Sequence, residues 1–192
     1  MINNESHLIE VVVYSDSYQQ EVIDLILNIQ QNEFHVPITL EDQPDLLTIP
    51  SFYQGATGVR RPLLHNHAQA SDTKGNFWIA THEGKVVGTI ALLGFSNDQA
   101  ALRKMFVAKD FRGKELGTAQ KLFDTLLSWS KEKGIREIYL GTLSHMFAAH
   151  SFYRRNGFVE MRKEELPENF PLVHVDSMFF KLKLESNSVT KL

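Results

Sequence analysis

Short runs of apolar residues alternate along the chain with segments in which apolar residues recur every three or four positions. Short β-branched runs bounded by turn residues indicate strands, whereas the three-to-four spacing indicates an amphipathic helix. The pattern predicts strands at 9–14, 76–80, 86–93, 100–107, 135–140 and 176–184, and helices from Ser17 to Ile29, from Leu116 to a stop at Gly134, and from Met146 to Arg155. This alternation predicts an α/β fold.

Turn residues separate these elements and mark one long irregular segment. Ser17 and Gln20 predict a capping box at the start of the first helix, and the glycine within His82–Lys85 predicts a hairpin. From 39 to 75 the pattern weakens, and the prolines and glycines there predict short helical pieces within loop. An irregular segment this long is usually functional or mobile. We expect one domain over 1–184, followed by a polar tail at 185–192.

The composition is that of a soluble globular domain. Of the 192 residues, 43% are hydrophobic and 22% are charged, which is enough for a substantial core. The formal net charge of −3 gives no bulk attraction to nucleic acid or to an anionic membrane. The longest apolar stretch, 86–95, is too short to span a bilayer, and the first ten residues lack a signal-peptide pattern. We expect a cytoplasmic protein without nucleic-acid or membrane partners, and leave a homodimer open.

The sequence also excludes several kinds of chemistry. Because it contains no cysteine, disulfides, thiolate metal sites and a cysteine nucleophile are ruled out. His65 and His67 form a pair with no third candidate ligand, so we interpret them as part of an exposed loop and expect no metal site.

A glycine-containing loop joins the strand at 100–107 to the helix that follows it. The loop reads Arg112-Gly113-Lys114-Glu115-Leu116-Gly117-Thr118. The first turn of a helix has N–H donors without internal partners, and its dipole favours an anion. Glycines allow the backbone to approach a bulky phosphate group. The loop is therefore a candidate cradle for a diphosphate; the alternative is an ordinary strand-to-helix turn.

Two motifs together resemble the GNAT superfamily of acetyl-CoA-dependent N-acetyltransferases. The first is the loop pattern Q/R-x-x-G-x-G/A, which Arg112 and Gly117 match and Glu115 does not, because a glycine is usual at its place. The second is Ala149-x-x-Phe152-Tyr153-x-x-x-Gly157-Phe158, which fits throughout. The resemblance covers about 9–184 and is densest over 102–158. A carboxylate at 115 would repel a diphosphate unless the side chain points away.

The resemblance implies a mixed, mostly antiparallel twisted sheet with a splayed central V and flanking helices. In such folds the bulged fourth strand diverges from the fifth, so backbone groups of Met105, Phe106 and Val107 are free to pair with the pantetheine arm. Acetyl-CoA would be the acyl donor, with no metal. The coenzyme-binding residues that the resemblance implies are these strand residues, the loop residues Arg112, Gly113, Lys114, Glu115, Leu116, Gly117 and Thr118, and Ala149 and Phe152.

The resemblance also implies roles in catalysis. It places Tyr153 near the coenzyme sulfur, where a phenol can protonate the leaving thiolate; the alternative is an aromatic ring that only packs beside Phe152 and Phe158. Many relatives carry a glutamate base where this chain has Ala101. That leaves a water relay or another side chain as the base. His145 is one candidate, because an unperturbed imidazole suits proton transfer, although a loop or capping histidine is the preferred interpretation, and Glu33 and His35 are alternatives.

The acceptor site is less well defined by the sequence. Glu33 and His35 follow the first helix, in a region that commonly borders the acceptor in such folds, and Phe77 is an aromatic candidate for its lining. The ordinary alternatives are a solvated helix end and a core aromatic residue. The segment 165–176 resembles the connection between the last two strands of some relatives, and either closes the acceptor site or only joins the strands.

These features predict an enzyme that transfers the acetyl group of acetyl-CoA directly to an amine. The expected acceptor is a small metabolite, an amino acid or a drug-like molecule. A peptide or protein amine is the alternative within the same chemistry. A sensor domain that binds acyl-CoA without turnover is the alternative from another class.

Overall fold

A seven-stranded sheet runs through the part of the chain that the computed structural model describes, residues 8–55 and 74–185. Its strands are β1 (Glu10–Val13), β2 (Asn76–His82), β3 (Lys85–Gly94), β4 (Gln99–Val107), β5 (Glu137–Thr142), β6 (Val159–Met161) and β7 (Met178–Lys183). The spatial order is β1-β2-β3-β4-β5-β7-β6, and the β4–β5 pair alone among the described strands is parallel. The sheet is mixed, mostly antiparallel and open, as predicted.

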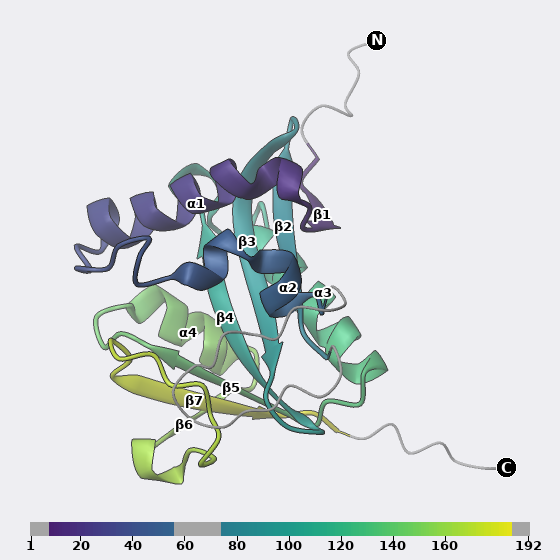
Figure 1. The fold of residues 1–192 in the computed structure, drawn as a ribbon, viewed down its shortest axis with the longest axis vertical. Helices are drawn as coiled ribbons and strands as arrows, with labels where there is room; N and C mark the ends of the chain where they lie inside the picture. Colours follow the sequence, from purple (N-terminus) through teal and green to yellow (C-terminus); the bar gives the residue numbers. More distant parts are fainter. Residues whose placement is uncertain (1–7, 56–73, 186–192) are drawn as a thin grey trace, which may run out of the picture.

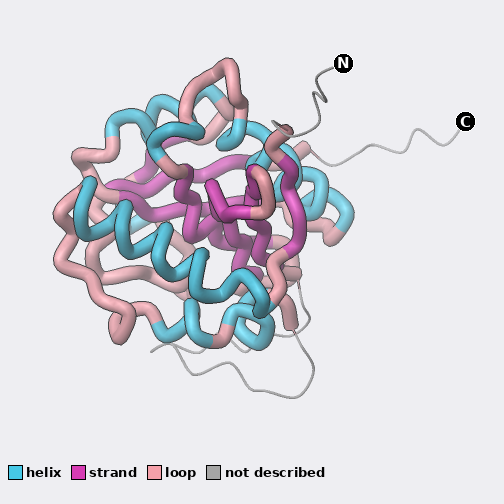
Figure 2. Tube along the Cα trace, turned by 90° about the horizontal axis from the view of Figure 1, so that it is seen from above, coloured by secondary structure: helices cyan, strands magenta, loops and turns pink. Residues whose placement is uncertain are grey.

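Helices cover both faces of this sheet (Figures 1 and 2). On one face lie α1 (Gln19–Leu27), its π-helical continuation η2 (Asn28–Glu33), the 3₁₀ turn η3 (Pro44–Leu47) and α2 (Ile49–Tyr53). On the other lie α3 (Thr118–Glu132) and α4 (Phe147–Arg155). Successive strand residues point to opposite faces, so each face has its own apolar cluster. No helix among the described residues is long and apolar enough to cross a membrane.

The strands β4 and β5 separate after a short stretch of pairing. They pair only at Gln99↔Glu137, Ala100↔Ile138 and Ala101↔Tyr139, beyond which β5 continues along β7. In Figure 1 the two strands leave a common end and diverge, with α4 in the angle between them. A β-bulge lies on the free part of β4, where Lys104 and Met105 oppose Ile90. Lys104 has a φ of 50°, and its carbonyl accepts a hydrogen bond from Thr89 Oγ1 at 2.7 Å.

A polar network fastens the closed end of this opening. The Glu137 carboxylate of β5 accepts hydrogen bonds from Gln99 of β4 at 2.9 Å and from the Tyr139 hydroxyl at 2.7 Å, and pairs with Lys181 of β7 at 2.6 Å. Burial alone would raise the pKa of Glu137, but hydrogen bonds from Lys181, Tyr139 and Gln99 outweigh it and lower the pKa to about 2. Three strands are therefore tied together where the opening begins.

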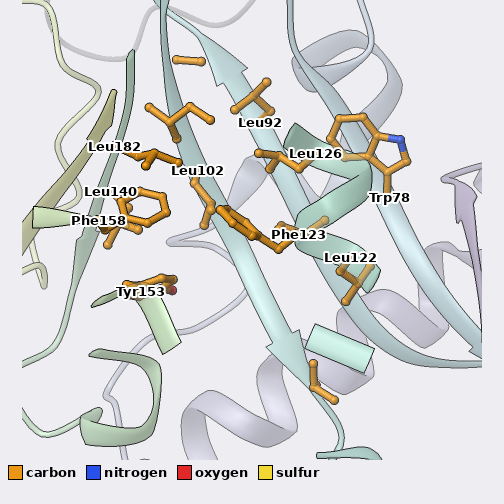
Figure 3. Close-up of a cluster of buried hydrophobic side chains, with 14 of the residues drawn as sticks. Trp78, Leu92, Leu102, Leu122, Phe123, Leu126, Leu140, Tyr153, Phe158 and Leu182 are labelled. Atoms are coloured by element: carbon orange, nitrogen blue, oxygen red, sulfur yellow. The ribbon is translucent and has the colours of Figure 1, made fainter. Parts of the chain in front are cut away.

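The apolar cluster beneath α3 and α4 reaches the opening. Figure 3 shows Leu122, Phe123 and Leu126 of α3 packed against Leu102 of β4, with Tyr153 of α4 at one side next to Phe158. Leu122, Phe123 and Leu126 are fully buried. This core fixes the position of both helices relative to the free edge of β4.

Most of the predicted elements are present, with three corrections. The strand Val159–Met161 was not predicted, and Leu116 precedes α3 instead of lying within it. The predicted capping box is wrong: the Ser17 hydroxyl contacts Ser15 at 2.8 Å, while the Gln20 side chain donates to Asp24. The hairpin at Glu83–Gly84 and the helix stop at Gly134, with a φ of 69°, are confirmed. The pair His65 and His67 and the tail beyond 185 lie outside the described residues.

Candidate active site

A pocket of about 930 Å³ occupies the opening between β4 and β5. The free edge of β4 forms one wall, including the predicted coenzyme contacts Met105, Phe106 and Val107. The glycine loop and α4 line it on one face of the sheet, and η2, η3 and the segment 170–176 line it on the other. The pocket thus connects the two faces through the gap in the sheet.

The glycine loop presents unpaired donors to this pocket. Within the described structure, the backbone N–H groups of Gly113, Lys114, Glu115 and Leu116 have no acceptor, and the buried Thr118 hydroxyl has no hydrogen-bond partner. Gly113 and Gly117 have φ values of 109° and 64°, a region that favours glycine. Gly113, Lys114 and Gly117 line the pocket, whereas Glu115 and Leu116 are exposed and do not. The loop therefore offers donors to an anion without directing the Glu115 carboxylate into the pocket.

The Arg112 side chain fixes the start of the glycine loop to the end of β4 and to η2. Its Nε donates to the Val107 carbonyl at 2.7 Å, and its guanidinium pairs with Glu33 of η2 at 2.8 Å. Glu33 was predicted to contact the acceptor, but this ion pair directs its carboxylate to the glycine loop, and it does not line the pocket. The Arg112–Glu33 pair therefore links the two walls of the pocket.

Tyr153 projects from α4 into the same pocket. Its ring packs against Phe158 and Phe180, with centroid distances of 5.6 and 5.9 Å, and the residue is 6% exposed. Its hydroxyl has no hydrogen-bond partner among the described residues. Burial and the negative charge of Asp176 raise the pKa of Tyr153, so the phenol stays protonated at neutral pH. Ala149 and Phe152, on the same helix, also line the pocket.

Charged side chains gather on the opposite side of the pocket. Lys104 of the bulge contacts Asp45 of η3 at 3.3 Å and donates to Gln43 at 2.6 Å, and the Tyr53 hydroxyl donates to Asp45 at 2.5 Å. Burial lowers the pKa of Lys104 to about 8, against the opposing effect of Asp45. For Asp45, burial acts to raise the pKa, but the Lys104 and Arg103 charges prevail and lower it.

Asp176 is a partly buried carboxylate that the sequence did not single out. It lies just before β7, and its neighbour Ser177 donates its N–H to the Thr142 carbonyl at 2.9 Å. The carboxylate rests on Gly141 of β5, where an added Cβ would lie 2.1 Å from Asp176 Oδ2. Burial raises the pKa of Asp176 to about 6, although Arg103 opposes the shift. In the sequence, the signal for this residue is its place at the end of the segment 165–176, which resembles a connection that closes the acceptor site or only joins the strands.

Three other predicted residues occupy less central places. His145 lines the pocket but is exposed at its rim, 6.2 Å from the Phe34 ring. His35 is exposed, has a φ of 52° and does not line the pocket. The Phe77 prediction needs correction: this side chain is fully buried between Tyr14 and Tyr53, at 5.5 and 5.4 Å, because β2 directs it into the core. Ala101, the position for which the resemblance implied a glutamate base in other members, is 1% exposed and apolar.

Comparison with known proteins identifies the class. A family model described as an acetyltransferase (GNAT) domain matches residues 73–160. A solved GNAT-family acetyltransferase from Staphylococcus aureus Mu50 is 37% identical, with a TM-score of 0.80 over 92% of this chain and 99% of that one. The chain therefore belongs to the GNAT family of acetyltransferases.

Two curated relatives match a shorter region. The probable N-acetyltransferase camello of Xenopus tropicalis is 35% identical over 105 residues, which is 54% of this chain and 46% of that protein. The N-acetylaspartate synthetase of the same species is 34% identical over 56% of this chain and 40% of its own length. This chain thus spans less than half of either relative. A Thermoplasma acidophilum PaiA N-acetyltransferase, solved in complex with coenzyme A, shares the fold with a TM-score of 0.63 at 16% identity, covering 92% of this chain and 99% of that one.

Proposed function

We propose that this protein transfers the acetyl group of acetyl-CoA directly to the amine of a small molecule. The observation that carries the proposal is a single pocket, in the opening between β4 and β5, that contains both the glycine loop and the Tyr153 hydroxyl. Acetyl-CoA carries a diphosphate, which the glycine loop could bind, and its thioester releases a thiolate, which Tyr153 could protonate. Family membership supports the same reaction class.

The residues of the loop fit the diphosphate of the coenzyme. The unpaired N–H groups of Gly113 and Lys114, which line the pocket, offer hydrogen bonds just before the start of α3, where the helix dipole favours negative charge. Lys114 adds a positive charge at the pocket. The unpaired edge of β4 offers backbone groups to an extended pantetheine arm, as an added strand would.

The chemistry follows from where the polar groups lie. The free amine attacks the thioester carbonyl carbon, and a backbone N–H of β4 near the bulge stabilises the resulting oxyanion. Tyr153 then donates its proton to the departing thiolate sulfur, and the nitrogen returns a proton to the phenolate. Because its pKa is raised by burial, Tyr153 is protonated when the thiolate leaves. No covalent acetyl-enzyme is needed.

The acceptor side favours a small molecule. It is bounded by η2, η3 and the segment 170–176, the last of which is fixed to β5 through Ser177 and Thr142. The pocket volume of about 930 Å³ is in the range of small-ligand sites and must hold the reactive end of the donor as well.

The first test compares binding and turnover in the wild type and in Tyr153→Phe. We expect wild-type protein to bind acetyl-CoA in calorimetry and to release free CoA when given a suitable amine from a panel. In Tyr153→Phe we expect kcat to fall by about 100-fold or more, because a general acid contributes roughly 10²–10⁴-fold. Acetyl-CoA affinity should change little, because the proposed proton transfer occurs only as the thiolate leaves, and the ring keeps its packing against Phe158 and Phe180.

The outcomes separate the alternatives. Binding without turnover of any amine would identify an acyl-CoA sensor and contradict the proposal. Equal losses of affinity and turnover in Tyr153→Phe would show that the ring packs and the hydroxyl transfers no proton. Transfer to peptides alone would replace the small-molecule acceptor.

A further inference from the structure

The charges of the acceptor side are not all paired with each other. Lys104 and Asp45 form a close pair that Tyr53 and Gln43 complete. Arg103 of β4 and Asp176 also line the pocket, and within the described structure neither has an ion-pair partner within 4.0 Å. Arg103 and Asp176, both partly buried, therefore remain available to a ligand, whereas the third carboxylate of this side, Asp42, is exposed and accepts hydrogen bonds from Thr39.

The apolar lining around Arg103 and Asp176 favours a ligand with groups of opposite charge. The acceptor side is otherwise lined largely by apolar side chains, among them Val36, Ile38, Phe170 and Val175. In such surroundings an unmatched guanidinium or carboxylate is costly, and a ligand group of opposite charge is bound more strongly than in water. A guanidinium is suited to a carboxylate because its fork of N–H donors matches the two oxygens.

We propose that the acceptor is an amine that carries a carboxylate, with Arg103 binding that carboxylate and Asp176 binding the ammonium group and removing its proton. This inference rests on the proposed function. An α-amino acid or β-amino acid has both groups within a few bonds of each other, as do the free termini of short peptides. The cationic and anionic side chains match the opposite charges of such a zwitterion, so Arg103 and Asp176 each gain an oppositely charged partner.

The proton step balances within the site. The ammonium group transfers one proton to the Asp176 carboxylate, which yields a neutral amine and a carboxylic acid. The amine nitrogen forms a bond to the acetyl carbon as the carbon–sulfur bond breaks, and Tyr153 supplies the proton to sulfur. The nitrogen then gives its remaining excess proton to the Tyr153 phenolate, which leaves a neutral amide and restores the phenol. The proton on Asp176 leaves to solvent after the products depart, which restores the carboxylate.

Gly141 supports this assignment of Asp176. The carboxylate lies directly over the Gly141 backbone, and any side chain there would displace it. The segment that carries Asp176 is fixed by the backbone hydrogen bond from Ser177 to Thr142 of β5 and by an internal turn from Asp176 N–H to the Val173 carbonyl at 3.1 Å. The carboxylate is thus placed by the fold at the pocket, where the charge of Arg103 lowers its pKa and its own charge raises the pKa of Tyr153.

The test measures selectivity between acids and amides. Purified full-length protein with acetyl-CoA is given a panel of α- and β-amino acids, each beside its own carboxamide, together with simple alkylamines. We expect at least one acid to be acetylated with a kcat/KM about 10- to 100-fold above that of its amide, the range for a hydrogen bond to a charged group. In Arg103→Gln this preference should fall to near one, mainly through a higher KM for the acid.

Arg136→Gln is the matched control. Arg136 is an exposed arginine before β5 that does not line the pocket, so the same change there should leave the preference intact. Calorimetry with the preferred acid, on protein saturated with CoA, should show binding to the wild type and to Arg136→Gln but not to Arg103→Gln.

Each other result is decisive. If amides or alkylamines are acetylated as well as acids, or if the preference survives in Arg103→Gln, the carboxylate subsite is refuted while acetyl transfer stands. If acetyl-CoA binds but no amine is acetylated, the proposed function fails together with the inference. Unchanged acetyl-CoA binding in Arg103→Gln confirms that the variant is folded and that its defect lies at the acceptor.

Discussion

At the scale of single residues, the proposed acceptor site depends on the position of the Asp176 carboxylate, which is confined against the backbone of Gly141. This carboxylate is seated on a glycine and faces Arg103 and Lys104 from β4, Tyr153 from α4 and His174 from its own segment. Burial raises the pKa of Asp176 to about 6, which is near the working range of a general base. An ordinary aspartate would be a weaker proton acceptor by about two pKa units.

This raised pKa predicts the pH dependence of the reaction. Below about pH 6 the Asp176 carboxylate is protonated and cannot accept a proton, so kcat/KM should fall with decreasing pH through that value. In Asp176→Asn we expect a loss of roughly 10²–10⁴-fold at pH 7 and no fall centred on pH 6. Rates measured from pH 5 to pH 9 with one acceptor check both statements.

Stability provides the control for Asp176→Asn. A carboxyl group whose pKa is raised by folding stabilises the fold below its ordinary pKa of 3.8, and that contribution is lost as the pH rises through about 6. At pH 7 the neutral asparagine should therefore be at least as stable as aspartate in urea unfolding. A marked loss of stability together with an unchanged pH profile would assign Asp176 to packing.

Residue roles were the least predictable level. Tyr153 was singled out because it lies in a contiguous motif on one helix, and in the structure it lines the pocket, while its role in catalysis stays a prediction. Arg103 and Asp176 are far apart in sequence and meet only because β4 and the segment before β7 approach the same opening. Phe77 was misplaced because both faces of β2 are buried, so an aromatic residue on this strand packs in the core whichever way it points.

At the scale of elements, the glycine loop and the bulge do most to define the donor side. The bulge interrupts β4 where β5 turns away, and the loop follows within ten residues. The Arg112 side chain joins the loop to the end of β4 and to η2. The strand β4 and the helix α3 thus position the bulge and the glycine loop, whose backbones have free hydrogen-bonding groups.

We expect Gly117→Asp to weaken acetyl-CoA binding by at least 10-fold. The substitution adds negative charge and bulk at the start of α3, where the diphosphate would lie, and it strains a backbone with a φ of 64°. Gly134→Asp is the matched control, because Gly134 ends the same helix with a φ of 69° and has open space around it. Calorimetry on both variants separates the backbone strain, which they share, from repulsion of the phosphates.

Equal affinities in the two variants would place the diphosphate elsewhere. Loss of folding in Gly117→Asp alone would show that the loop supports α3. The melting temperatures of both proteins are therefore measured first, and Gly117→Asn serves as an uncharged replacement if the aspartate variant is unstable.

At the scale of the whole molecule, the order and type of elements followed from the periodicity of apolar residues. The pairing of strands did not, because β5 and β7 must pair across the intervening α4 and β6, and no local pattern specifies such contacts. The open V came only from the resemblance. The polar network at Glu137 was invisible in the sequence, since Gln99, Glu137 and Lys181 become neighbours only in the folded sheet.

Initial-rate kinetics test the arrangement of the whole molecule. Direct transfer requires both substrates to be bound at once, so double-reciprocal plots at several acceptor concentrations should intersect. Parallel lines would indicate an acetylated enzyme and contradict direct transfer.

The gap between β4 and β5 has a further consequence for how the protein is controlled. The pocket is lined from both faces of the sheet, with the glycine loop on one side and the Arg103–Asp176 subsite on the other. In the proposed complex free coenzyme A therefore dissociates from one face of the sheet and the acetylated product from the other. Either product can dissociate first. Accumulating free coenzyme A would slow such an enzyme at every concentration of amine, because no excess of acceptor can displace a ligand from the face it does not share.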